Sequence, residues 1–360
     1  MDQFSCRTKI LSGAGAVQGL AQLKSSKLLL VTDPFFVKNG VAQSVAEAAK
    51  AAQVKIFDGV QPDPSATLAA QGTAVVKEFQ PDTVVALGGG STMDCAKAMV
   101  YFSGLSPCLV AIPTTSGSGS EVTDFAILTH KDVKHPLVDA SLCPQMAILD
   151  TDLLKELPKQ LVADTGFDVL SHAAEAFVAA NAGAITDALA GAAFAMALEA
   201  LPASFAGDMQ AREQMHMAAT MAGMAFTQAG LGLCHAMAHA LGGAFHIPHG
   251  RLNAILLPAV VGYNASFSAD KYAQLARRSA LGAAAQSLAV RNLKSGLIRL
   301  RRELGLPQTL TQAGVDPRQI RQQRQQLIEA ALADVCCTTN PAPVDAAVVG
   351  ALLEEVAGVV

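Results

Sequence analysis

Five side chains between residues 168 and 249 have the types and the spacing of a metal site. Asp168 and His172 lie four residues apart in a helix-compatible stretch, so both would project from one face of a helix. His235 and His239 repeat this spacing, and His249 follows fourteen residues after His235. An imidazole buried among apolar residues needs partners for its nitrogens, and a divalent cation is one such partner. The pattern therefore predicts a metal site.

A site built from Asp168 and three imidazoles would offer oxygen and nitrogen donors and no thiolate. Such a donor set suits Fe(II), Zn(II), Mn(II) and Ni(II), and it disfavours Cu(I) and iron–sulfur clusters. With four protein ligands, a substrate oxygen would be the fifth, which suits Fe²⁺ better than tetrahedral Zn²⁺. Iron is therefore the predicted metal and zinc the alternative. A single buried histidine is more often only hydrogen-bonded in a core, which is our interpretation of His130, His135 and His216.

A glycine-rich segment in the first half suits the phosphates of a dinucleotide. Gly88-Gly-Gly-Ser91 follows an apolar, strand-like run and precedes a helix-compatible stretch, so its backbone N–H groups could approach a pyrophosphate at a helix N-terminus. The structural alternative is a capping box formed by Ser91 and Asp94. A hydroxyl-rich loop, Thr114 to Ser118, follows the next strand and would reach the same cofactor from the neighbouring strand end.

Asp33 stands directly after another strand-like run, residues 27–32. Its carboxylate could accept hydrogen bonds from a ribose 2′-hydroxyl and would repel a 2′-phosphate, which favours NAD over NADP. An N-cap or turn role before Pro34 is an equally good interpretation of the same residue.

The elements that must position these residues change in kind along the chain. Short apolar runs that look like buried strands occupy 27–32, 54–57, 83–87 and 108–112, and helix-like stretches occupy 41–52, 65–79 and 92–103. After residue 158 the sequence consists of Ala-, Leu- and Met-rich helical patterns. This organisation predicts an α/β N-terminal domain with a parallel nucleotide-binding sheet, residues 1–157, and an all-α C-terminal domain for metal and substrate, residues 158–360.

Composition argues against several classes of protein. The 360 residues carry 26 Lys and Arg against 30 Asp and Glu, a net charge of −4, so a nucleic-acid partner is not expected. Residues 217–250 lack Asp, Glu, Lys and Arg, but their histidines, glycines and Pro248 are unsuited to lipid, so no membrane span is predicted. The scattered cysteines and the N-terminal residues, which show no secretory signal, predict a cytoplasmic protein.

Four motifs in order along the chain resemble those of the iron-containing (group III) alcohol dehydrogenases. The segment 88–97, GGGSTMDCAK, matches the family pattern GGGSxxDxAK, and the segment 112–122, IPTTSGSGSEV, matches IPTTxGTGSEV. The segment 165–172, TGFDVLSH, is similar to TGxDALTH, and residues 230–250 are similar to GLxHxxAHxLG…PHG. Residues 222–233 and 337–343 further resemble the 1-propanol and ethanol dehydrogenases of propanediol- and ethanolamine-utilisation systems.

This resemblance implies a function and assigns roles to residues. It implies reversible hydride transfer between NAD(H) and a short primary alcohol or aldehyde, with His239 beside the metal as a proton relay. The implied iron ligands are Asp168, His172, His235 and His249. The implied NAD contacts are Asp33, Gly89, Gly90, Ser91, Asp94, Thr114, Thr115, Ser118 and Lys134. It also implies a homodimer or a higher homo-oligomer, and it leaves open whether the protein resides inside a bacterial microcompartment.

The sequence departs from the family pattern at two cofactor positions, and two other functions stay open. Asp63 stands where many members have Asn, and Ser118 replaces a Thr. A dehydroquinate-synthase-like lyase would share the architecture, NAD and a metal, but would need several Lys and Arg around its anionic substrate. The segment 217–250 offers none before Arg251. The second alternative is a non-enzymatic scaffold in which the metal is purely structural.

Overall fold

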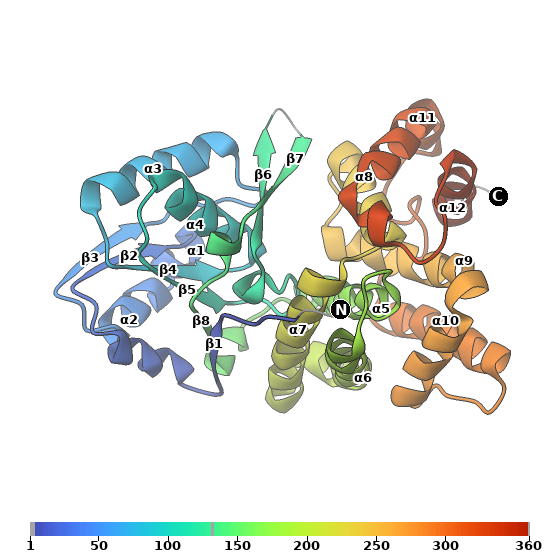
Figure 1. The fold of residues 1–360 in the computed structure, drawn as a ribbon, viewed down its shortest axis with the longest axis horizontal. Coiled ribbons are helices and arrows are strands. Elements are labelled where there is room, and N and C mark those ends of the chain that lie inside the picture. The colour runs from blue at the N-terminus through green and yellow to red at the C-terminus, as the bar shows by residue number, and fades with distance from the viewer. Residues whose placement is uncertain (1–3, 131–132, 359–360) are drawn as a thin grey trace. The chain divides into compact units, whose positions relative to one another are not determined.

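The computed structural model describes residues 4–130 and 133–358, drawn in Figure 1. The chain divides into two compact units, Ser5–Leu157 and Pro158–Val360. The first unit combines strands with helices. In the described part of the second unit, the regular elements are all helical. This is the predicted fold class, an α/β unit followed by an all-α unit.

A six-stranded parallel sheet forms the centre of the first unit, in the strand order β1-β8-β5-β4-β2-β3. Its strands are β1 (Lys9–Ser12), β2 (Lys27–Val31), β3 (Gln53–Phe57), β4 (Thr83–Gly88), β5 (Cys108–Pro113) and β8 (Met146–Leu149). Its helices are α1 (Pro34–Lys38), α2 (Val41–Ala48), α3 (Ala66–Phe79) and α4 (Gly90–Ser103). The predicted parallel sheet is confirmed, and the four strands read from the sequence form its β5-β4-β2-β3 part.

The strands of this sheet are apolar on both faces because helices cover both. Alternate residues of β2 point to opposite sides, so Leu28 and Leu30 join a core beneath α2, while Leu29 and Val31 join a second core beneath α3 and α4. Figure 1 shows α3 and α4 on one side of the sheet and α2 on the other. This double burial explains why the strands read as continuous apolar runs.

Two strands of the sheet and one hairpin were not predicted. β1 and β8 are only four residues long, and β1 is partly exposed, so neither has a long apolar signature. β6 (Phe125–His130) and β7 (Val133–Val138) pair antiparallel outside the main sheet. The hairpin follows the hydroxyl-rich loop, and its half-exposed alternation is a weaker signal than a buried strand.

Eight α-helices build the described part of the second unit. They are α5 (Lys159–Val178), α6 (Ala184–Ala206), α7 (Met209–Ala229), α8 (Leu233–Phe245), α9 (His249–Arg278), α10 (Gln286–Glu303), α11 (Pro317–Ala333) and α12 (Ala346–Ala357). A short 3₁₀ segment, Val335–Thr339, follows α11. Helix α5 is buried along most of its length, which explains why its sequence reads as apolar apart from a few polar residues.

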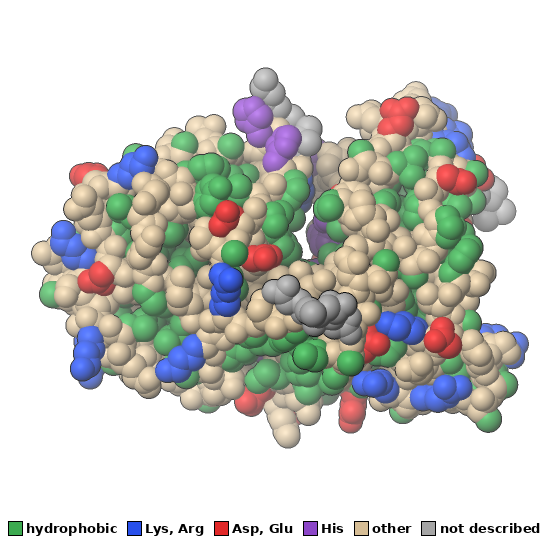
Figure 2. Space-filling view, viewed as in Figure 1, with side chains coloured by type: hydrophobic (Ala, Val, Ile, Leu, Met, Phe, Trp, Pro, Cys, Tyr) green, Lys and Arg blue, Asp and Glu red, His purple; other side chains and the backbone are tan. Residues whose placement is uncertain are grey.

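Length and apolar composition alone would allow two of these helices to cross a membrane. They are α6 and α9, and 44% and 61% of their most apolar stretches are buried inside the structure. Core helices of a folded protein have the same properties, so this signal is weak. On the face of the molecule in Figure 2, Lys and Arg side chains are interspersed with Asp and Glu.

Glycine permits the close approach of α9 to α5. A Cβ atom on Gly250 would overlap the backbone carbonyl oxygen of Asp164, and it would lie 3.3 Å from the Cβ of Asp168. Backbone atoms in a buried helix cannot move aside at low cost. The first turn of α9, which carries His249, can therefore pack against α5 only with glycine at position 250.

We expect Gly250→Ala to destabilise the helical unit by about 1–3 kcal/mol, because the added methyl group overpacks the α5–α9 contact. Thermal unfolding should show a midpoint lowered on the order of 5 °C. Gly243→Ala is the control, because nothing lies within 4 Å of its added Cβ and alanine favours a helix. An unchanged midpoint for Gly250→Ala would contradict this packing.

Candidate functional site

One carboxylate and three imidazoles converge inside the helical unit. The Oδ1 atom of Asp168 lies 3.9 Å from Nε2 of His172, 3.8 Å from Nε2 of His235 and 3.5 Å from Nε2 of His249. The rings of His172 and His235 stack with centroids 4.5 Å apart. The structure therefore brings together the four residues expected as metal ligands.

Three helices supply these side chains. Asp168 and His172 lie one turn apart on α5, His235 lies in the first turn of α8, and His249 is the first residue of α9. Asn253, one turn after His249, faces the same point, and its Nδ2 atom lies 2.8 Å from Oδ1 of Asp168. The same Nδ2 atom lies 3.3 Å from Nε2 of His235 and 3.1 Å from Nε2 of His249. An amide N–H thus brings partial positive charge to a cluster of acceptor atoms.

Asp168, His235 and His249 offer donor atoms that fit a divalent cation in type and separation. Ligand atoms that bind one ion at about 2.0–2.2 Å lie within about 4 Å of one another. All three distances from Asp168 Oδ1 satisfy this limit. The ligand atoms of Asp168, His235 and His249 lie within 4.8 Å of one another, and His172 is not part of this mutually close group. Oxygen and imidazole nitrogen without thiolate suit Fe²⁺ and Zn²⁺.

The electrostatics of the cluster favour an ionised carboxylate. Burial alone would raise the pKa of Asp168, but the neighbouring His172, His249 and His235 hold that pKa well below its usual value. Burial lowers the pKa of His235, yet the nearby carboxylates of Asp168 and Glu175 raise it to about 9. Burial and the other histidines place the pKa of His249 well below its usual value. The ionised carboxylate of Asp168 therefore faces three imidazoles that cannot all carry a positive charge at once. A divalent metal ion would supply positive charge at this point.

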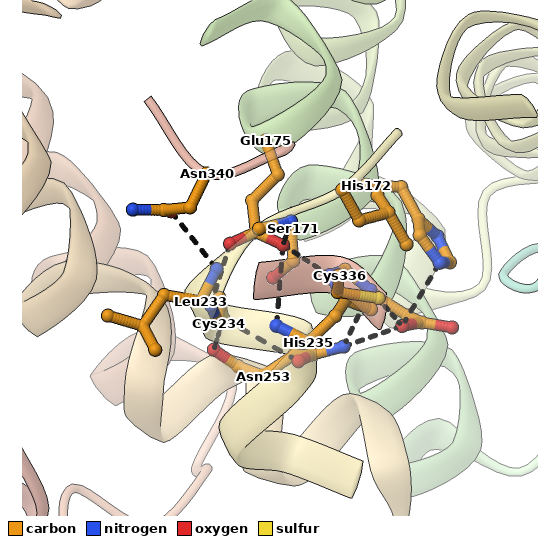
Figure 3. A network of polar contacts seen from close by, with 12 residues as sticks. Ser171, His172, Glu175, Leu233, Cys234, His235, Asn253, Cys336 and Asn340 are labelled. Atoms are coloured by element: carbon orange, nitrogen blue, oxygen red, sulfur yellow. Dashed lines mark hydrogen bonds and ion pairs between the residues drawn. The ribbon is translucent and has the colours of Figure 1, made fainter. Parts of the chain in front are cut away.

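A second buried carboxylate, that of Glu175, supports the cluster of Asp168 and the three histidines. It was not predicted from the sequence. Glu175 Oε2 lies 2.6 Å from Nδ1 of His235, and the side chain of Glu175 is 2% exposed. Figure 3 shows Glu175 reaching from α5 to the start of α8. The available signal was its place on α5: Asp168, His172 and Glu175 follow the i, i+4, i+7 spacing of one helix face.

His239 lies beside the cluster and has a partner of its own. Its ring stacks on that of His249 with centroids 5.1 Å apart, and its Nδ1 atom lies 2.8 Å from Oδ2 of Asp334. Although burial raises the pKa of Asp334, the bonded His239 lowers it to about 2. Cys336 completes a second possible ligand group with these two, but burial raises the pKa of its thiol far above the usual value, so it is a poor thiolate ligand.

In the α/β unit, the glycine loop and the hydroxyl-rich loop lie together at one edge of the sheet. β4 and β5 pair in parallel up to Gly88 and Pro113, and Thr114 N donates to Gly88 O at 3.0 Å. A Cβ on Gly89 would lie 3.3 Å from Thr115 Oγ1, and one on Gly90 would lie 3.0 Å from Ser118. The loops are therefore close enough to contact one ligand.

Two polar side chains of α4 hold these loops in place. Asp94 on α4 accepts hydrogen bonds from Ser120 Oγ at 2.7 Å and from Ile127 N at 3.0 Å. Lys97 is 1% exposed and donates to Thr123 and to the Phe125 carbonyl at 2.9 Å, while burial lowers its pKa to about 8. In this structure, Asp94 and Lys97 act as supports of the loop that follows β5.

Asp33 takes the N-cap role, and Lys134 pairs with an acid. Asp33 Oδ1 accepts hydrogen bonds from Phe35 N at 2.8 Å and from Phe36 N at 3.4 Å. Lys134 Nζ lies 2.6 Å from Oδ1 of Asp63, and the backbone N–H of Asp63 donates to Ser91 Oγ at 3.2 Å. The departure at position 63 thus joins Lys134 to the glycine loop.

Comparison with known proteins identifies the family. A model described as iron-containing alcohol dehydrogenase matches residues 7–151, and one described as the C-terminal part of the Fe-containing alcohol dehydrogenase family matches residues 162–357. The chain belongs to the iron-containing alcohol dehydrogenase family. The resemblance found in the motifs is confirmed, and the protein is an oxidoreductase that acts on CH–OH groups.

Relatives cover this alcohol dehydrogenase along its whole length. It is 40% identical to the 1-propanol dehydrogenase PduQ of Citrobacter freundii, over 99% of this chain and 100% of that protein. It is 37% identical to the NADPH-dependent butanol dehydrogenase of Clostridium saccharobutylicum, over 95% of this chain and 94% of that protein. The structure of a 1,3-propanediol oxidoreductase superposes with a TM-score of 0.93 and 33% identity, covering 99% and 100% of the two chains. These similarities do not favour the lyase or the scaffold.

We expect His249→Ala to retain well under one equivalent of metal after anaerobic loading with Fe²⁺ or Zn²⁺ and dialysis, because one of four donors is removed. Elemental analysis of the dialysed protein measures this. His135→Ala, which removes an exposed histidine of the β6–β7 hairpin, should bind metal like the parent protein. Full metal content in His249→Ala would exclude His249 as a ligand.

Proposed function

We propose that this alcohol dehydrogenase is iron-dependent and NAD(H)-linked, and that it interconverts short-chain aldehydes, such as acetaldehyde and propionaldehyde, with primary alcohols. The observation that carries the proposal is the convergence of Asp168 and three imidazole nitrogens in a chain of this family. The relatives named as propanol and butanol dehydrogenases support short primary alcohols as the substrate class.

In this proposal, Asp168, His172, His235 and His249 hold the metal, with Fe²⁺ as the ion and Zn²⁺ as the alternative. A divalent cation there supplies Lewis acidity, which polarises a carbonyl oxygen and lowers the pKa of an alcohol hydroxyl. Apolar helices around the cluster keep bulk water from most of its donor atoms, because Asp168, His172 and His235 are buried. Electrostatic effects are stronger in such a dry site than in water.

His239 is the residue that would move the proton. Asp334 stays ionised at neutral pH and can only accept a hydrogen bond, so Nδ1 of His239 carries a hydrogen and Nε2 is the nitrogen that exchanges a proton. In aldehyde reduction, Nε2 would supply the proton to the product oxygen, directly or through water. In alcohol oxidation it would take the proton away.

NAD(H) would bind across the glycine loop and the hydroxyl-rich loop. Both contacts of Asp33 with the start of α1 use Oδ1, so Oδ2 is the oxygen that would accept the ribose hydroxyls. A carboxylate there would repel a 2′-phosphate. One relative is named as NADPH-dependent, so the preference for NADH rests on Asp33 and not on similarity.

We also propose a homodimer or higher homo-oligomer in the cytoplasm, with the interior of a bacterial microcompartment as the alternative location.

After anaerobic reconstitution with Fe²⁺ or Zn²⁺, the protein should oxidise NADH in the presence of aldehydes from acetaldehyde to butyraldehyde. Absorbance at the NADH band measures the rate. Because the proposed activity depends on the metal and on Asp33, we expect metal-free protein to be inactive and NADPH to be the poorer reductant. His249→Ala serves as the metal-poor control. An NADH fluorescence titration without any binding would contradict the proposal and favour a scaffold.

His239→Ala should keep its metal but lose turnover by about 10²-fold, because general acid–base assistance is removed and the four proposed ligands stay in place. Steady-state rates and elemental analysis on the same sample measure both quantities. Asp334→Asn should lower turnover to a smaller extent, since it removes only the partner that orients His239. Loss of metal in His239→Ala would instead make His239 a ligand.

A further inference from the structure

The start of α8 is a buried helix N-terminus with no side-chain cap of its own. Its N-cap residue is Gly232, and the following residues Leu233, Cys234 and His235 are buried. The first N–H groups of a helix have no partner inside the helix, so buried ones must be satisfied from elsewhere. The N–H of Leu233 donates to Oδ1 of Asn340 at 3.1 Å.

Glu175 satisfies the other N–H groups at this helix start. Its carboxylate accepts hydrogen bonds from Gly232 N at 2.9 Å, Cys234 N at 2.7 Å and His235 N at 3.3 Å. The positive end of the helix dipole adds to these bonds, which explains how a carboxylate can be stable at 2% exposure. Figure 3 shows these contacts between α5 and the first turn of α8.

The same carboxylate determines which nitrogen of His235 can bind a metal. Glu175 Oε2 lies 2.6 Å from Nδ1, and because a carboxylate only accepts, Nδ1 must carry the hydrogen. In the neutral ring, Nε2 then presents its lone pair toward Asp168, at 3.8 Å. Asn253 Nδ2 also faces Nε2, at 3.3 Å, and an amide N–H can only donate.

Glycine makes this arrangement possible. A Cβ at position 232 would lie 2.8 Å from both Oε1 of Glu175 and Oδ1 of Asn340. Any larger residue would therefore push the carboxylate away from the helix start. The side chains of Glu175 and Asn340 hold the first turn of α8 in place beside Gly232, and His235 lies in that turn.

We propose that Glu175 is a positioning residue that fixes the tautomer and the orientation of His235, and that metal affinity depends on this contact in addition to the capping of α8. This inference rests on the proposed metal site. Glu175 itself contacts neither substrate nor metal in the proposal; it acts through His235. Removing a group that hydrogen-bonds a metal ligand in this way commonly lowers metal affinity by about 10–100-fold.

Glu175→Gln tests the inference with little change in shape. If the amide nitrogen faces His235, it donates to Nδ1 and places the hydrogen on Nε2, where it blocks metal binding. If the amide oxygen faces His235, the nitrogen meets the N–H of Cys234 and two donors oppose each other. Either outcome weakens the site, although the side chain keeps its size.

Asn340→Ala is the matched control, because it removes a cap from the same helix start without touching His235. We would measure the affinity for Zn²⁺ by competition with a chromophoric chelator, the visible spectrum of the Co²⁺-loaded protein, and the thermal midpoint of the metal-free protein. Both variants should lower the midpoint. Only Glu175→Gln should weaken Zn²⁺ binding about 10–100-fold and alter the Co²⁺ spectrum, while Asn340→Ala stays within about 3-fold of the parent.

Equal losses of Zn²⁺ affinity in the two variants would overturn the inference, because Glu175 would then act only as a cap. Parental Zn²⁺ affinity in Glu175→Gln would overturn it as well. If Glu175→Gln does not fold, Glu175→Asp replaces it. Its shorter carboxylate lengthens the contact with His235, so its Zn²⁺ affinity should fall further than that of Asn340→Ala, and equal affinities would again overturn the inference. Failure of the parent protein to bind Zn²⁺ at all would contradict the proposed metal site itself.

Discussion

A carboxylate buried among apolar helices is costly unless donors or positive charge surround it, and the helical unit satisfies this requirement at Asp168. Imidazole nitrogens from α5, α8 and α9 and the amide of Asn253 face its oxygen. The three helices must therefore keep their relative positions for these contacts to persist. Close contacts at Gly250 and Gly232 make those positions possible, since a side chain at either place would separate the backbones or displace Glu175.

Polar groups of the α/β unit also have hydrogen-bond partners, and there these bonds hold a loop in place. Lys97 is buried and Asp94 is half-buried on α4, and both form hydrogen bonds with the segment 120–127, which follows the hydroxyl-rich loop. Side chains of α4 therefore hold the loop in place. Its residues Thr115 and Ser118 can then lie against Gly89 and Gly90, although the loop itself is rich in glycine and serine.

The main strands and helices were readable from local patterns, and the supports of the site were not. β2, β4 and β5 are buried on both faces, so each gives a continuous apolar run. β1 and β8 are four residues long, and their pairing joins segments 137 residues apart, from Lys9 to Met146, so no local pattern indicates it. The same holds for the ion pair of Asp63 and Lys134, which are 71 residues apart.

The amino-acid sequence alone shows the types of donor available, their spacing along single helices and the motifs that mark the family. Those properties depend on residues within one or two turns of one another, where helix geometry is regular. The folded structure was needed to show that Glu175 contacts His235, 60 residues away, and that Asp334 contacts His239, 95 residues away. Such contacts depend on how helices pack, because packing and not spacing determines which buried donor finds which acceptor.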